Sequence, residues 1–561
     1  MKNIQKLLFL AVCLCTAFTV NAQNLTVTGK VIDSEGLEVI GANVTLKDTP
    51  GVGAISDLSG NYKIKVNNAA KDILVFSYIG MRTQEIHVKG KTVINVTLQS
   101  DAKALDEVVV VGYGTSKRSD LTGSVVSVKS EDLMKMPTSD VTQALAGRVA
   151  GVQITQSEGA PGSTISIRVR GGISITQSNE PLYIIDGFPS EDGMSTIDPA
   201  EIETIDILKD ASATAIYGAR GANGVVVITT KRGNKDGSKM SISFDSYVGV
   251  KTLARKLPVL STKEFVLLDY ERRLQFDGEA GVKNFQSIYG SFLDINENYG
   301  NYAGIDWQEE TLGRTTTSQN YRVRISGGNK ELQYSLNYTY FKDLGAMLYS
   351  GNDKHNISFS LSHNPTKRIS VNARVNYDQT YIYGMGTSDQ STRFNKMEHI
   401  LQYRPTKGIY GDDESLLKSE EDNITDEEGN PMQNPLTSAA EETNKRQLRT
   451  FQANGGLIFN IAKGLSFRNN TGMRYQTTRN DVFYGEKSSN GKRSSANGYI
   501  QYAENSSFQT SNVLNYEYKK KKHKLIAMLG QEWVSRWTRN MRASATNFPN
   551  NDINLDDMNL G

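Results

Sequence analysis

The sequence predicts a mainly β protein that combines an N-terminal β-sandwich, an α+β unit and part of a transmembrane antiparallel β-barrel. Three observations support this fold class. Short alternating segments separated by turns fill residues 24–99, strands and helices mix over residues 119–232, and long strands of strict period two follow residue 239. Side chains alternate between the two faces of a strand, so a period of two indicates a sheet with one apolar face.

The first 22 residues predict a secretory signal peptide. Basic residues precede an uncharged apolar run over residues 7–20, which is too short to cross a bilayer and ends in small residues. We expect cleavage between Ala22 and Gln23. The only two cysteines, Cys13 and Cys15, lie early in this run after bulky neighbours. We therefore favour a cleaved leader over a lipoprotein anchor and expect a mature chain without disulfides.

Residues 23–100 predict a small β-sandwich, because several short strands are separated by turn signals every 8–12 residues. No cluster of catalytic residue types occurs there, and we expect His87 to be a surface residue of a strand. A spacer or docking module is the role that this composition supports. The expected strands cover residues 25–32, 41–46, 61–66, 73–78 and 92–98.

Residues 101–118 form a polar linker that contains four successive valines, Val108 to Val111. β-Branched residues prefer the extended backbone, and an extended segment in a polar stretch offers its N–H and C=O groups to a partner sheet. Such strand addition is one way in which a peptide binds another protein. Taken alone, the run is better explained as an ordinary buried strand. Its place in the chain favours strand addition.

Residues 119–235 predict a compact α+β unit. We expect a helix that begins at Ser139 or Asp140 and runs through Val149, a short helix at Asp198 with proline in its first position, and a third helix stopped by Gly218. The expected strands cover residues 125–128, 164–170, 181–187 and 224–230.

The glycines at 218, 221 and 224 invite a nucleotide-binding interpretation. A dinucleotide-binding loop places its glycines after a strand and before a helix. Here they follow a helix and precede a strand, so we reject that function and expect tight turns.

Residues 236–561 predict the N-terminal part of an outer-membrane β-barrel. The apolar positions 332, 334, 336, 338 and 340 alternate with polar ones, and similar strands exceed nine residues, close to the ~9–11 that cross a membrane. Short turns alternate with long polar loops, as in outer-membrane barrels. We expect about nine or ten strands. An open half-barrel would expose its edges to lipid, so we expect this chain to be a piece of a longer one.

Several contiguous stretches of the sequence resemble a known protein family. The stretches LDEVVVVGYG (105–114), ALAGRVAGV (144–152), PLYIIDG (181–187) and ILKDASATAIYG (207–218), with its continuation to residue 230, resemble the plug region of SusC/RagA-type TonB-dependent transporters. The preceding domain resembles a carboxypeptidase-regulatory-like module, and residues 239–561 resemble the first part of the barrel.

This resemblance implies a 22-stranded barrel in the full-length protein, closed by a plug, in the outer membrane of a Gram-negative, Bacteroidetes-like cell. The N-terminal domain and the plug would lie on the periplasmic side. The partners implied are outer-membrane lipid, the energy-transducing TonB–ExbB–ExbD complex and a SusD-like surface lipoprotein. The implied TonB box, which would pair with TonB, consists of Asp106, Glu107, Val108, Val109, Val110, Val111 and Gly112.

The function expected from this resemblance is active import of a large nutrient, and the favoured cargo is an oligosaccharide. Import of peptides, or of a metal chelate or cobalamin, is the alternative within the same fold. A surface adhesin and an exported enzyme are alternatives from other classes. No H-E-x-x-H zinc pattern is present, and we expect no catalytic residues, metal or cofactor. The formal net charge of +2 argues against nucleic acid as a partner.

Three further groups of residues are candidates for ligand contacts, but the sequence assigns no substrate-binding residue. Trp307, Trp533 and Trp537 could stack on sugar rings, but we favour interface or loop-core positions. The acidic stretch 411–429 could bind calcium, but a solvated loop is the better interpretation. Arg168 and Arg170 could meet the barrel wall or line the permeation path, but we favour pairing with carboxylates of the α+β unit.

Overall fold

The computed structural model describes residues 25–560 except 34–35, 48–52, 67–71, 79–80, 82, 100–107, 112–113, 118–124, 135–139, 157–158, 164, 170, 173, 176–177, 191–192, 234–239, 385–395, 410, 412, 418–431, 489–490, 492–494, 521–522, 550 and 552–553. The expected signal peptide and its cleavage site at Ala22 and Gln23 lie outside the described residues. The chain divides into two compact units, residues 1–109 with 115–122 and residues 110–114 with 123–561. No helix of the described residues is long and apolar enough to cross a membrane.

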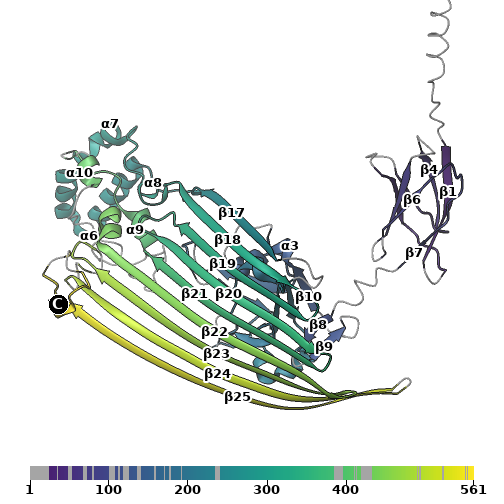
Figure 1. Cartoon of the computed structure of the whole chain (residues 1–561). Coiled ribbons are helices and arrows are strands. Elements are labelled where there is room, and N and C mark those ends of the chain that lie inside the picture. Colours follow the sequence, from purple (N-terminus) through teal and green to yellow (C-terminus); the bar gives the residue numbers. More distant parts are fainter. Residues whose placement is uncertain are drawn as a thin grey trace, which may run out of the picture. The chain divides into compact units, whose positions relative to one another are not determined.

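The first unit contains the β-sandwich that the sequence predicts (Figure 1). One sheet has the order β4 (Asn61–Val66), β1 (Leu25–Asp33), β7 (Val96–Leu98). The other has the order β3 (Gly53–Ile55), β2 (Asn43–Leu46), β5 (Ile73–Ser77), β6 (Gln84–His87). Apolar side chains of both sheets, such as Val27 and Phe76, form one buried core.

Two of these strands, β3 and β6, were not expected from the sequence. They are three and four residues long, and β6 has the sequence QEIH, so neither shows a run of apolar alternation. Their place in the sheet comes from pairing with β2 and β5. His87 ends β6 and is exposed, as expected.

The α+β unit is built on a five-stranded sheet with the order β10-β15-β16-β13-β14. Its apolar residues form a buried core that includes Leu145, Ile185, Ile202 and Ile228. The strands are β10 (Val125–Lys129), β13 (Leu182–Ile185), β14 (Phe188–Ser190), β15 (Ile202–Leu208) and β16 (Val225–Thr230), with a separate hairpin of β11 (Val152–Gln156) and β12 (Ile165–Val169). The helices are α3 (Ser130–Leu133), α4 (Val141–Leu145), η2 (Pro199–Glu201), α5 (Ala211–Thr214) and η3 (Ala215–Gly221).

The structure corrects one helix and adds one central strand. Helix α4 starts at the expected cap, because the Asp140 carboxylate accepts hydrogen bonds from the N–H groups of Thr142 and Gln143. It ends at Leu145 and does not reach Val149, because Ala146 has a ψ of 128° and Gly147 a φ of 72°, both outside the right-handed helical region. Strand β15 was not expected, because its acidic residues interrupt the apolar pattern.

The glycines near residue 220 make turns. Gly218 has a φ of 57° and ends the expected helix, and Gly224 has a φ of 89° directly before β16. Left-handed conformations of this kind suit glycine, which lacks a Cβ atom. Asp186 and Gly187 also have positive φ values, of 50° and 92°, in the two-residue turn between β13 and β14.

Nine long antiparallel strands follow, each paired with its sequence neighbours; this sheet is called the wall. The expected rhythm of loops is present. Consecutive strands are joined at one end by the short segments 329–331, 367–368, 463–464 and 521–522, and at the other end by 252–315, 345–350, 384–441 and 485–496. The strands are β17 (Ser241–Lys251), β18 (Thr316–Gly328), β19 (Leu332–Leu344), β20 (Gly351–Thr366), β21 (Ile369–Tyr383), β22 (Glu442–Ala462), β23 (Leu465–Tyr484), β24 (Asn497–Lys520) and β25 (His523–Thr546).

The two longest connections fold into helices at one end of the wall (Figure 1). Trp307 is buried in their core, and its ring N–H donates a hydrogen bond of 2.8 Å to the carbonyl of Arg404. Of the acidic stretch 411–429, the structure describes only residues 411 and 413–417. The helices are α6 (Thr262–Tyr289), η4 (Phe292–Asp294), α7 (Ile295–Tyr299), α8 (Trp307–Leu312), α9 (Lys396–Gln402), α10 (Asp413–Leu417) and α11 (Pro435–Glu441), and η6 (Met558–Leu560) follows β25.

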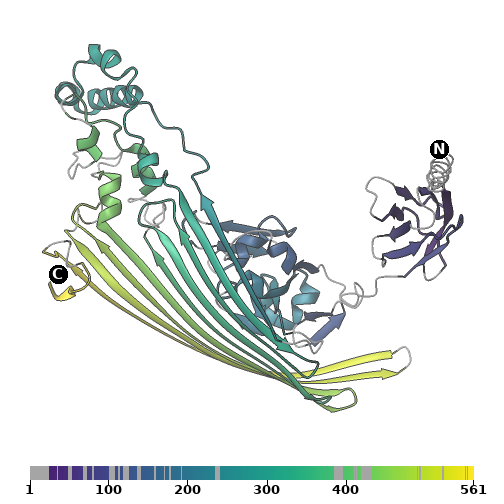
Figure 2. The ribbon, with the colours of Figure 1, turned by 45° about the horizontal axis from the view of Figure 1, so that its top comes forward.

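The two faces of the wall differ in chemistry. Polar side chains such as Asn320, Ser335 and Asn376 are buried on the inner face. Large apolar side chains such as Leu336 and Phe359 are exposed on the outer face. The α+β unit lies against the inner face (Figure 2).

Candidate functional site: the interface between the α+β unit and the wall

One short segment of the α+β unit carries many of its contacts with the wall. It consists of residues 195–201, between β14 and β15, and is called the docking turn. Its 3-10 helix η2 is capped by Asp198, whose carboxylate accepts a hydrogen bond of 2.7 Å from the N–H of Ala200. The cap fixes the backbone of the turn, so that both of its carboxylates, Asp198 and Glu201, meet the wall.

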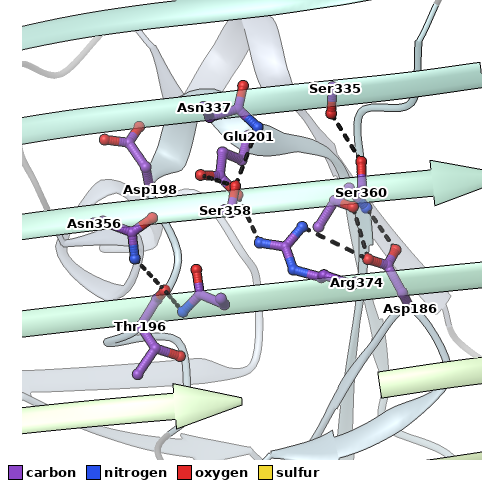
Figure 3. A network of polar contacts seen from close by, with 12 residues as sticks. Asp186, Thr196, Asp198, Glu201, Ser335, Asn337, Asn356, Ser358, Ser360 and Arg374 are labelled. Atoms are coloured by element: carbon purple, nitrogen blue, oxygen red, sulfur yellow. Dashed lines mark hydrogen bonds and ion pairs between the residues drawn. The ribbon is translucent and has the colours of Figure 1, made fainter. Parts of the chain in front are cut away.

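Glu201 makes the most buried of these contacts. Its carboxylate is 2.6 Å from the Nη2 atom of Arg374 on β21 and accepts a hydrogen bond of 2.7 Å from the Ser358 hydroxyl on β20. Asp186, at the β13–β14 turn, lies on the other side of the same guanidinium at 3.9 Å (Figure 3). Asp186 is itself held by the Thr230 N–H and hydroxyl, at 2.9 and 2.7 Å.

A second ion pair and several amides hold the rest of the docking turn. Asp198 lies 2.8 Å from the Nε atom of Arg322 on β18. The carbonyl of Thr196 accepts hydrogen bonds from the side-chain amides of Asn356 and Asn376, at 2.9 and 3.2 Å (Figure 3). The Lys354 ammonium donates to the carbonyl of Ser195. Strands β18, β20 and β21 therefore all contact this one turn.

The charges across this interface are complementary, with carboxylates on the α+β unit and cations on the wall. The wall also affects Lys231, whose backbone N–H donates to the carbonyl of Glu201 at 2.7 Å. Burial, followed by the nearby charges of Arg324 and Arg322, lowers the pKa of the Lys231 ammonium. The carboxylates on the α+β unit and the cations on the wall are complementary, and such complementarity fixes the register of two surfaces.

The same interface holds polar groups that the protein leaves unpaired. Asn320 is fully buried, and neither its Oδ1 nor its Nδ2 atom has a hydrogen-bond partner among the described residues. The Oε1 atom of Gln333 and the Oδ1 atom of Asn372 are in the same situation. An unpaired buried polar group costs about 1–3 kcal/mol.

The valine run of the expected TonB box forms strand β8 (Val108–Val111), and Asp106, Glu107 and Gly112 lie outside the described residues. Strand β8 pairs with β9 (Gly114–Lys117) in a separate two-stranded sheet. The extended conformation agrees with the sequence analysis, whereas the hairpin partner was not expected. Each strand of a two-stranded sheet has one edge without a partner among the described residues, and such an edge can accept another strand.

The sequence predicted the short helix of the docking turn at Asp198 but not its contacts with the wall. The expected pairing of Arg168 and Arg170 with carboxylates of the α+β unit stays a prediction. Arg168 is exposed on β12 and makes no ion pair with a carboxylate of the α+β unit among the described residues; Arg170 lies outside them. A usable signal was present: Arg322 and Arg374 occupy polar positions in the middle of period-two strands, where they face the inside of the sheet.

One of the three tryptophans occupies a position that the sequence analysis favoured. Trp307 belongs to the core of the loop helices. Trp533 and Trp537 are 57% and 51% exposed on β25, at alternate outward positions opposite the inward-facing Glu532. None of the three faces the docking turn.

The helices at the long-loop end enclose a cavity of about 880 Å³, lined by Phe265, Leu268, Trp307 and other side chains. Its polar lining groups already serve the fold. Glu264 forms a capping box with Ser261 at the start of α6, and the Gln308 side chain bonds both backbone groups of Leu257. We therefore assign no ligand to this cavity.

Comparisons with known proteins identify the sandwich and the α+β unit. Residues 117–225 match the family described as TonB-dependent Receptor Plug Domain, and residues 27–110 match the CarboxypepD_reg-like domain. TonB-dependent receptor P3 of Formosa agariphila is 32% identical over 566 residues, covering 100% of this chain and 53% of the relative. TonB-dependent receptor SusC of Bacteroides thetaiotaomicron is 38% identical over 349 residues, covering 61% of this chain and 32% of the relative.

The chain belongs to the SusC/RagA-type TonB-dependent receptors. Its α+β unit is the plug, as the sequence resemblance predicted. A solved structure of the RagAB peptide importer in the open-open state has 25% sequence identity and a TM-score of 0.64, and covers 79% of this chain and 50% of that one. The predicted fold class is confirmed, with a partial barrel.

The chain spans about half the length of the curated relatives it matches. Family membership implies an outer-membrane location. The relatives are receptors of a transport family.

Proposed function

We propose that the protein takes part in TonB-dependent active import of a large nutrient across the outer membrane, together with a SusD-like surface lipoprotein. The observation that carries this proposal is the plug held on the inner face of the wall by the docking turn. An interface with complementary charges and unpaired polar groups suits a stopper that is retained at rest and released under force. The proposal assigns no catalytic residue to the chain.

In this proposal, TonB applies the force to the proposed TonB box, residues 106–112. Strand β8 has a free edge among the described residues, and pairing with a strand of TonB would place several backbone hydrogen bonds in parallel. Several such bonds, pulled along the strand, can transmit load and still separate. In the chain this segment is followed by β9 and then by β10, an edge strand of the plug sheet.

We predict that Val109→Pro abolishes uptake while substrate binding at the cell surface is retained. Proline removes a backbone donor and breaks strand pairing. The matched control is Val109→Thr, which keeps the N–H group and the β-branched shape and should transport normally. Uptake of labelled nutrient and surface binding are measured on the same cells. Normal uptake by the proline variant would contradict the TonB-box assignment.

Two cargo classes remain candidates. Oligosaccharide is the class implied by the sequence resemblance, and peptide is favoured by the structural likeness to the RagAB peptide importer. Growth of a deletion strain on purified glycans and purified peptides separates them: growth lost on one panel alone identifies the cargo class. Growth unchanged on both panels would contradict import of either.

A further inference from the structure

The four short turns of the wall share a positive charge. Each of them contains at least one lysine or arginine, and the fourth belongs to the run Lys-Lys-Lys-Lys-His-Lys at residues 519–524. In that run, Lys521, Lys522 and the side chain of Lys524 lie outside the described residues. The exposed cations that the structure describes at this end of the wall are called the basic rim and are Lys330, Lys367, Arg368, Lys463, Lys519 and Lys520.

Carboxylates are few at the same end. Within three residues of the short turns, the described acidic residues are Glu331 and Glu517, and the Glu517 carboxylate lies 2.7 Å from the ammonium of Lys519. The other five cations of the basic rim have no ion pair with a carboxylate of the described residues. The long connections differ in sign, since acidic residues outnumber basic ones in both 252–315 and 384–441. The positive charge is therefore a property of one end of the wall.

The basic rim lies directly beyond the apolar outer face. At three of the short turns, an exposed apolar or aromatic side chain is followed or preceded by a cation two residues away, within about 7 Å of extended chain. A lysine covers apolar surface with its aliphatic stem and keeps its ammonium in a polar layer. The cations are therefore placed at the level where the apolar face ends. The three pairs are Leu332 with Lys330, Ile461 with Lys463 and Tyr518 with Lys520.

The aromatic side chains mark the same level. Tyr516 and Tyr518 are each 43% exposed on β24, next to the lysine run. Tyrosines are enriched where a membrane meets water, because their rings are apolar and their hydroxyls polar. The basic rim thus coincides with the boundary between hydrocarbon and head groups.

Two simpler explanations account for less of this pattern. Charge that only kept the turns soluble could have either sign, whereas all four turns carry cations. A protein partner with an acidic surface would contact one part of the rim. The cations instead recur from the β18–β19 turn to the β24–β25 turn, across the described width of the wall.

We propose that the basic rim binds the phosphate groups of anionic phospholipids, in the leaflet that the short turns face. In outer-membrane barrels this is the periplasmic leaflet. Head groups surround a barrel, so they match a charge that recurs at each short turn, and clusters of lysine and arginine beside a membrane attract anionic lipid. Ammonium and guanidinium groups form charge-assisted hydrogen bonds with phosphate oxygens. The inference requires that the wall lies in the outer membrane, and it does not depend on import of a nutrient.

Spin-labelled lipids test the proposal on the full-length protein in phosphatidylcholine vesicles. Electron spin resonance measures how much labelled phosphatidylglycerol, and how much labelled phosphatidylcholine, the protein immobilises. The wild type should prefer phosphatidylglycerol by about threefold or more, since one lysine near an anionic surface contributes a factor of about five and the rest of the lipid shell dilutes it. The preference should disappear at about 1 M salt, where the screening length is only about 3 Å.

Substitutions in the rim test the assignment to these residues. Combining Lys330→Gln, Lys367→Gln, Arg368→Gln and Lys520→Gln should reduce the preference at least by half. Combining Lys330→Arg, Lys367→Arg and Lys520→Arg keeps the charge at the same positions and should keep the preference. Resistance of each barrel to unfolding by dodecyl sulfate at room temperature shows that it is folded.

A control at the other end of the wall uses exposed cations of the long first connection. Arg255→Gln with Lys283→Gln should leave the preference unchanged. Loss of the preference in this control, equal immobilisation of both lipids by the wild type, or an unchanged preference in the glutamine variant would each overturn the proposal. If the glutamine variant does not fold, the wild type decides, because a preference that high salt leaves intact is not electrostatic.

Uptake by the same variants is measured separately in cells. A protein that prefers phosphatidylglycerol and does not import supports the lipid contact and contradicts the proposed function. A protein that imports without any lipid preference refutes the lipid contact and leaves the proposed function intact.

Discussion

At the scale of single residues, the structure assigns the hold on the plug to a few charged side chains. Arg374 lies between Glu201 and Asp186, and all three are largely buried from solvent. Taking charges out of water is costly unless each one has a partner. The arrangement is therefore stable only while it is complete, and removing one member should have a larger effect than removing the whole set.

We predict that Arg374→Ala weakens the attachment of the plug by about 3–5 kcal/mol, because it leaves the carboxylate of Glu201 buried without its partner. Arg374→Met combined with Glu201→Gln removes both charges and should lose much less. Protease susceptibility of the plug in the full-length protein measures the effect. A double variant as weak as the single one would show that burial of charge does not govern the contact.

A second residue-scale prediction concerns alkaline pH. The Tyr62 hydroxyl in the sandwich donates a hydrogen bond of 2.7 Å to the carbonyl of Ile94, and burial raises the pKa of its phenol to about 12. The unfolded pKa is about 10. A raised folded pKa means that this contribution to stability is complete below pH ~10 and is lost as pH rises through about 12.

The ultraviolet titration of wild type minus Tyr62→Phe should therefore show one phenol with a midpoint near 12. The loss of the phenol also removes one hydrogen bond, which should lower sandwich stability by about 1 kcal/mol. A midpoint near 10 would mean that the phenol is solvated in the folded protein.

At the scale of elements, short helices depend on their caps. Helix α4 has five residues, and the Asp140 carboxylate satisfies two of its first N–H groups. We predict that Asp140→Ala destabilises the plug by about 1 kcal/mol, whereas Asp140→Asn retains most of the stability because asparagine is also a good cap. Denaturant unfolding of the full-length protein, monitored by protease resistance of the plug, makes the comparison. Equal losses in both variants would indicate that the charge matters more than the cap.

Element boundaries also show where local sequence patterns stop being informative. The period-two strands of the wall, the sandwich core and the Asp198 cap followed from local patterns. Strands β6 and β15 did not, because their polar residues obscure the alternation and their place is decided by neighbouring strands. The contacts of the docking turn with the wall could not be predicted locally either, since its partners lie more than 100 residues away along the chain.

At the scale of the whole molecule, the alternation of short and long connections predicts a topology. We expect a peptide tag inserted after Phe276, which is 76% exposed in α6, to bind antibody on intact cells. A tag between Lys367 and Arg368, in a short turn, should bind only after the cells are permeabilised, because short turns of such barrels face the periplasm. Labelling of both tags on intact cells would contradict the proposed orientation.

The sequence by itself determined the class of each region, because hydrophobic period, turn residues and helix caps are local properties of the chain. It also carried the family resemblance, which resides in contiguous motifs of the plug. Only the tertiary structure decided which side of the wall meets the plug and that Glu201 and Asp186 share Arg374. Those contacts join residues that are far apart in the chain, and their energies depend on burial and geometry that no local pattern contains.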